Sequence, residues 1–86
     1  MRHPATAATF DWDEHNEEHL AEHGVRADEV EQIFLNAPTY HKNKRSAAGS
    51  WLMIGQTDAG RSLCISIVWV DERAGILRAI TGWPIK

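Results

Sequence analysis

The amino-acid sequence predicts an α+β domain, with two N-terminal helices packed on a three- or four-stranded antiparallel sheet. Three observations predict this class. Apolar residues recur at helical spacing in the first part of the chain, and they alternate in the manner of strands afterwards. Short segments with turn residues, at 57–60 and 71–75, separate the strand-like stretches. Helices followed by a meander of strands indicate helices on one face of a sheet.

The length and composition predict one domain with one core. The chain has 86 residues, and 43% hydrophobic content with four tryptophans is enough for one modest core only. The whole chain is therefore treated as a single domain. We expect residues 1–8 to be disordered, and we find no internal repeat or linker.

The first predicted helix has a recognisable start and stop. Residues 9–12 read as a very short strand that leads into Asp13, a good N-cap before an acidic first turn. Gly24 follows as the expected left-handed terminator. A second helix should start at Ala27 or Asp28 and end at residue 35 or 36, before Pro38. Its predicted buried stripe consists of Val30, Ile33 and Phe34.

Strand patterns fill the rest of the chain. The predicted strands cover residues 39–44, 50–57, 61–70 and 76–83. The first is basic, as edge strands often are. The third has apolar residues on both faces, which predicts a central strand. Pro84 is expected to end the last strand.

Charge divides the chain in two. The net charge is −3, which by itself argues against a nucleic-acid binder. However, residues 1–34 hold nine acids against two bases, and the remainder holds seven bases against three acids. This asymmetry suggests two faces with different partners, although a solvated acidic helix pair beside a mildly basic sheet explains it equally well.

The cysteine content and the hydropathy indicate the compartment. Cys64 is the only cysteine, so the chain can form no internal disulfide and no multi-cysteine zinc site. No apolar run is long enough for a signal peptide or a membrane helix. We therefore expect a soluble, cytoplasmic protein that does not associate with membranes.

Three histidines stand four residues apart in HNEEHLAEHGV, residues 15–25. On a helical wheel His19 and His23 share the predicted inward face with Asn16 and Leu20, and His15 lies on the flank. Polar groups at a helix–sheet interface need hydrogen bonds or a function. A structural role, an acid–base role and a metal site all remain open, although no third ligand stands at zinc-site spacing.

Three motifs in order resemble the BrnT family of toxins. The first is WDEHNEEHLAEHGVRADEVEQIF at 12–34, which is similar to the family pattern WD..N..H...HGV...EVE..F. The second is IGQTDAGRSL at 54–63, similar to GxTxxGRxL. The third is RAIT at 78–81, similar to RxIT/S. Together they cover most of residues 10–82.

This resemblance implies a RelE-like fold and the function of a bacterial type II toxin in the cytoplasm, active in stress responses. Such toxins are endoribonucleases that need no metal or other cofactor and use the ribose 2′-hydroxyl as nucleophile. The resemblance implies RNA as substrate and, as partner, a DNA-binding antitoxin of the BrnA type with a ribbon-helix-helix fold.

Mapped onto this chain, the resemblance gives four candidate catalytic residues. Arg61 and Arg78 are the expected phosphate clamps, since a guanidinium binds two phosphate oxygens. His19 or His23 is the expected acid–base residue. A surface charge at the hairpin end is an equally good explanation of Arg61.

Candidate substrate-binding residues are basic or aromatic. Lys42, Lys44 and Arg45 form a basic run that either tracks an RNA backbone or protects an edge strand from aggregation. Trp83 stands where the family often has an arginine, and the family's charged tail is absent. Trp83 either stacks on a base or fills the core. This departure motivates the alternative of a non-catalytic protein-binding module on the same fold.

Overall fold

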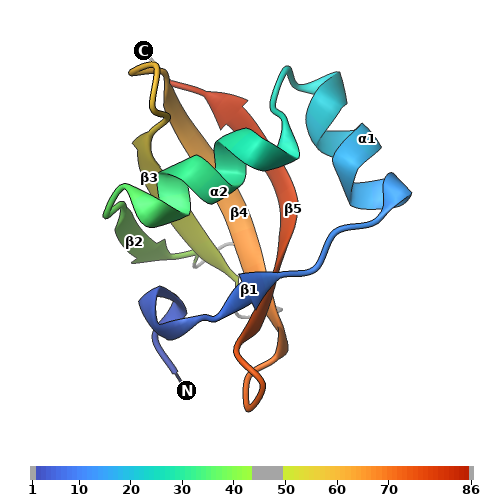
Figure 1. Ribbon diagram of the computed structural model, residues 1–86, viewed down its shortest axis with the longest axis vertical. Coiled ribbons are helices and arrows are strands. Elements are labelled where there is room, and N and C mark those ends of the chain that lie inside the picture. Colours follow the sequence, from blue (N-terminus) through green and yellow to red (C-terminus); the bar gives the residue numbers. More distant parts are fainter. Residues whose placement is uncertain (1, 44–49, 86) are drawn as a thin grey trace.

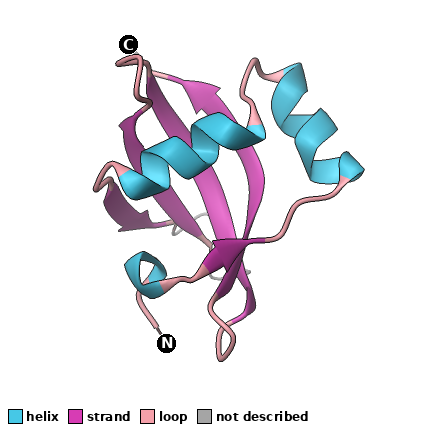
Figure 2. Ribbon diagram, viewed as in Figure 1, coloured by secondary structure: helices cyan, strands magenta, loops and turns pink. Residues whose placement is uncertain are grey.

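The computed structural model describes residues 2–43 and 50–85 as two helices and a five-stranded sheet (Figure 1). The strand order is β1-β5-β4-β3-β2. Figure 2 shows α2 crossing in front of the sheet, with α1 beside it. In chain order the elements are η1 (Pro4–Thr6, a 3-10 helix), β1 (Thr9–Phe10), α1 (Glu14–Glu22), α2 (Ala27–Leu35), β2 (Thr39–Lys42), β3 (Trp51–Gln56), β4 (Ser62–Asp71) and β5 (Ile76–Pro84).

The predicted α+β class is confirmed, but the predicted sheet was wrong in two respects. It has five strands rather than three or four, and it is mixed rather than antiparallel, because β1 pairs with β5 in parallel. The parallel pair is held by main-chain bonds, including Asp11 N to Leu77 O at 2.7 Å. A two-residue strand carries no periodic signal, so its direction is set by this long-range pairing.

Both helices begin and end as the sequence predicted. Asp13 accepts a bond from the Asn16 amide, and the Asn16 side chain accepts one from the Asp13 amide, which completes a capping box. Gly24 has φ of +75°, the left-handed conformation that ends α1. The second helix, α2, buries Val30 and Ile33 against the sheet.

Packing between the helices and one face of the sheet makes the core. The central strand β4 directs Leu63, Ile65 and Ile67 into it, and all three are fully buried. The last strand ends at Pro84, as predicted, although Pro84 itself still pairs with Leu63 as the final residue of β5. At the N-terminus, where the sequence predicted disorder, η1 buries Pro4.

Close approach of α1 to β5 positions the site described below. Gly82 lies under this approach: a methyl group there would make an ordinary contact of 3.4 Å with Leu20 Cδ2 but would lie only 2.5 Å from Ile65 Cδ1 of β4. Leu20 is fully buried and anchors α1 at this point. The helix therefore lies along β5, with its N-terminal end near Ala79 and its middle over Gly82.

A membrane span was not expected, and no helix in the described part of the chain is long and apolar enough to be one.

Candidate active site

A pocket of about 300 Å³ lies between the N-terminal half of α1 and β5. We call it the α1–β5 pocket. Its polar lining combines two imidazoles and one guanidinium, and its apolar lining comes from the strand. The lining residues are His15, Asn16, His19, Arg78, Ala79 and Ile80. This pocket brings together two of the four predicted catalytic residues, His19 and Arg78.

Arg78 is held at the pocket by two carboxylates. Its Nη1 lies 2.9 Å from Asp11 Oδ2 and 3.0 Å from Asp13 Oδ2, and its Nη2 donates to Asp13 Oδ1 at 3.1 Å. The hydrogen bond from Arg78, followed by that from the Asn16 amide, lowers the pKa of Asp13 to about 2. The bond to Asp13 in turn raises the pKa of Arg78. The guanidinium is fixed and charged, and its side chain stays 20% exposed.

Asn16 is a structural residue of the pocket wall. Its side-chain oxygen accepts from the Asp13 amide at 2.8 Å, and its Nδ2 donates to the carbonyls of Asp11 and Ala79 at 3.0 and 3.4 Å. These bonds satisfy a residue that is only 3% exposed. They also tie the start of α1 to β5, which fixes the distance between the histidines and Arg78.

The histidines of α1 are not arranged as the helical wheel predicted. His23 was expected to face inward, but it is exposed, and the His19 side chain is 45% exposed. The reason is that α1 lies at the side of the sheet, so only a narrow stripe with Asn16 and Leu20 is covered. His15, assigned to the flank, lines the pocket.

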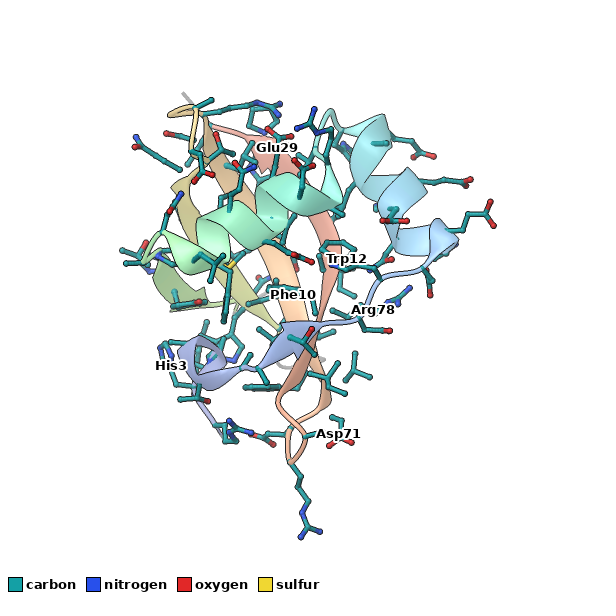
Figure 3. All side chains as sticks on the ribbon, viewed as in Figure 1. His3, Phe10, Trp12, Glu29, Asp71 and Arg78 are labelled. Atoms are coloured by element: carbon teal, nitrogen blue, oxygen red, sulfur yellow. The ribbon has the colours of Figure 1, made fainter. Side chains whose placement is uncertain are left out.

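Arg61 lies near the other end of α1 and does not line the α1–β5 pocket. Its Nη1 lies 2.9 and 3.0 Å from the two oxygens of Glu29, whose side chain is 13% exposed. Arg78 pairs across the sheet with Val68, seven residues beyond Arg61, so the two arginines are roughly 20 Å apart along the strands. In Figure 3, Glu29 and Arg78 are correspondingly well separated. The two arginines cannot grip one phosphate.

The predicted substrate-binding residues lie elsewhere. Lys42 is on the edge strand β2, with Nζ 5.6 Å from the centre of the Trp51 ring. Lys44 and Arg45 lie outside the described residues. Trp83 is 41% exposed on β5, beside Cys64 of β4, and is therefore not a core residue.

The described residues contain neither a cluster of three metal ligands nor a reactive thiol. Within 2–43 and 50–85, no three or more His, Cys, Asp or Glu residues gather as metal ligands. Cys64 is buried, and desolvation raises the pKa of its thiol, which keeps it protonated and unreactive.

The α1–β5 pocket therefore offers acid–base groups and an anion site at one place. Sequence reasoning missed His15, and it also missed Asp11 and Asp13 as the partners of Arg78. The spacing of His15 and His19 was a usable signal, because residues four apart share one side of a helix. The two ion pairs connect residues 67 and 65 positions apart, which no local pattern reveals.

Comparison with known protein families finds none whose pattern matches this chain, and comparison with curated proteins finds no similar sequence.

Proposed function

We propose that this protein is a metal-independent endoribonuclease that acts as the toxin of a type II toxin–antitoxin pair in the cytoplasm. The observation that carries the proposal is the convergence of His15, His19 and Arg78 on one pocket. The three sequence motifs that resemble the BrnT family support it. The α+β fold is consistent with the RelE-like arrangement that we propose with it.

In the proposed reaction, one histidine removes the proton from a ribose 2′-hydroxyl. The 2′-oxygen then forms a bond to phosphorus, and the bond from phosphorus to the 5′-oxygen breaks. The second histidine gives a proton to that leaving oxygen. Arg78 binds the non-bridging oxygens, where negative charge accumulates. The products are a 2′,3′-cyclic phosphate and a 5′-hydroxyl.

His15 and His19 fit the two proton-transfer roles because imidazole is the side chain that most often serves as a general acid or base. Both imidazoles line the pocket together with Arg78. For Arg78 to bind phosphate, an RNA phosphate must replace at least one carboxylate, Asp11 or Asp13. Asp11 is the easier to displace, since Asp13 also caps α1.

The test is cleavage of a labelled RNA by purified protein in the presence of a chelator. We expect fragments with 2′,3′-cyclic phosphate and 5′-hydroxyl ends. His15→Ala and His19→Ala should each lower the rate about 10²- to 10⁴-fold, as loss of a general acid or base does. His23→Ala is the matched control and should cleave at nearly the wild-type rate. Intact RNA with folded wild-type protein would overturn the proposal.

We further propose an antitoxin with a ribbon-helix-helix domain as the protein partner. The acidic residues 1–34 and the basic remainder support a partner with charged surfaces. Co-expression with the neighbouring reading frame, followed by purification through a tag on this chain, tests it. A stable complex that suppresses RNA cleavage is expected, and a neighbouring product that neither binds nor inhibits would contradict it.

A non-catalytic binding module is the second candidate function. It is favoured by the pairing of both arginines with carboxylates, since Arg61 binds Glu29 and Arg78 binds Asp11 and Asp13. Asp11→Asn discriminates between the two functions. A ribonuclease should bind RNA more tightly in this variant, because Arg78 has lost its charge-assisted bond to residue 11. A protein-binding module should cleave no RNA, either as the wild type or as Asp11→Asn.

A further inference from the structure

Two histidines at the C-terminal end of α1 form a pair, and His19 also lines the α1–β5 pocket. The ring centres of His19 and His23 lie 5.3 Å apart, with an angle of 71° between the ring planes. Residues at this spacing share one side of a helix. The His19 side chain is 45% exposed and His23 is exposed, so solvent reaches both rings.

This separation suits shared coordination of a metal ion. Two imidazoles on one tetrahedral zinc ion, each with a Zn–N bond of about 2.0–2.1 Å, have ring centres roughly 5 Å apart. His19 and His23 are already at that distance. Only side-chain rotation is needed to direct one nitrogen of each ring to a common point.

We propose that His19 and His23 bind a divalent late transition-metal ion such as zinc. Glu22 adds negative charge on the same turn, with its Oε2 3.9 Å from His19 Nδ1. Water completes the coordination, so the ion exchanges readily.

The electrostatic surroundings favour a cation at this position. The pair lies at the C-terminal end of α1, where the helix dipole attracts positive charge. Arg61 is a nearby positive charge that repels a cation, since its Nη2 would lie 3.6 Å from a methyl at Gly24. That guanidinium is compensated by Glu29. Imidazole donors select zinc, nickel and copper over magnesium and calcium, which prefer oxygen ligands.

Metal binding at this pair has a consequence for the α1–β5 pocket, and the consequence rests on the proposed function. His19 belongs to both sites, because it lines the pocket with His15 and Arg78. A metal-bound imidazole carries no exchangeable proton on the bound nitrogen, so His19 can no longer serve as acid or base through that atom. Zinc would therefore inhibit the ribonuclease.

Calorimetric titration of tag-free protein with zinc tests the site itself. We expect one ion per chain, and a loss of affinity of about tenfold or more in His19→Ala and in His23→Ala. His15→Ala and His3→Ala are the matched controls and should bind as the wild type does. Magnesium should give no binding at this pair.

Unchanged zinc affinity in His19→Ala and His23→Ala would overturn the inference. Equal affinity for magnesium would also overturn it, because it would indicate general attraction to the acidic helix surface. If His15→Ala lost affinity and His23→Ala did not, the pair would be the wrong one.

A second experiment separates this inference from the proposed function. Zinc should inhibit RNA cleavage by the wild type, and His23→Ala should cleave RNA but resist zinc. If the wild type cleaves no RNA, the proposed function fails and the calorimetric result still decides the metal site. If RNA is cleaved but zinc binding is absent, the metal inference alone fails.

Discussion

An arginine paired with carboxylate lies near each end of α1, but of the two only Arg78 lines the α1–β5 pocket. At the N-terminal end, Arg78 binds Asp11 and Asp13 and lines the α1–β5 pocket with two histidines. Near the C-terminal end, Arg61 binds Glu29 of α2 and links that helix to β4. The same kind of ion pair thus serves a candidate reaction site at one end and the packing of two elements at the other.

The largest expected difference between the two ends is in activity. Arg78→Ala should lower kcat/KM for RNA cleavage about 10²- to 10³-fold, because a donor to the transition-state oxygens is lost. Arg61→Ala should leave kcat/KM close to the wild-type value. Steady-state cleavage assays on both variants, with folding checked by circular dichroism, decide it. Equal losses in the two variants would remove the distinction between the ends.

Between the ends, Gly82 lies under α1 and leaves room for the side chain of Ile65 from β4. Gly82→Ala should lower the free energy of unfolding by about 1–3 kcal/mol, because the new methyl group overlaps Ile65 Cδ1. Urea denaturation measures this. Ile65→Val removes the overlapping atom, so it should destabilise the Gly82→Ala background less than the wild type. If the two substitutions changed the free energy of unfolding additively, the expected overlap between the new methyl group and Ile65 Cδ1 would be contradicted.

At the Arg61 end, the ion pair with Glu29 should contribute to stability. Glu29→Gln should lower the free energy of unfolding by about 1–2 kcal/mol, since it weakens charge-assisted bonds to a largely buried carboxylate. Asp28→Asn is the matched control, because its pair with Arg26 is exposed on both sides and solvent screening should leave its contribution to stability small. Urea midpoints that fall equally in the two variants would refute a packing role for Glu29.

The smallest expected effect is the pH dependence of the Arg78 end. The pKa of Asp13 is lowered to about 2 from its ordinary 3.8, so its stabilising contribution is fully present above pH 4. That contribution is lost as pH falls from about 4 to about 2. Thermal melts of the wild type and Asp13→Asn over this range measure it. The difference in Tm between them should shrink toward pH 2, and a constant difference would contradict the assignment.

Local signals in the sequence predicted much of the fold. Asp13 and Asn16 stand at the spacing of a capping box, and Gly24 marked the end of α1 correctly. The apolar residues on both faces of 61–70 correctly identified β4 as a central strand. The direction of β1 was not predictable, because two residues carry no period and their partner lies 67 positions away.

The candidate site was predictable only in part. The residues His19 and Arg78 were identified, but the wheel assumed that a whole side of α1 is covered, and so it misplaced His23. The separation of Arg61 and Arg78 could have been predicted from the sequence. A hairpin that turns at 71–75 pairs Arg78 with a residue near Val68, which leaves Arg61 far along the strand. The carboxylates around Arg78 needed the tertiary structure.

The most direct test of the central claim is where RNA binds. Histidine and arginine side-chain NMR signals can be followed while an oligonucleotide with 2′-deoxyribose, which cannot be cleaved through a 2′-hydroxyl, is added. We expect shifts at His15, His19 and Arg78 that saturate together, with little change at Arg61. Shifts centred on Arg61, or none at the three pocket residues, would contradict the assignment of the α1–β5 pocket as the reaction site.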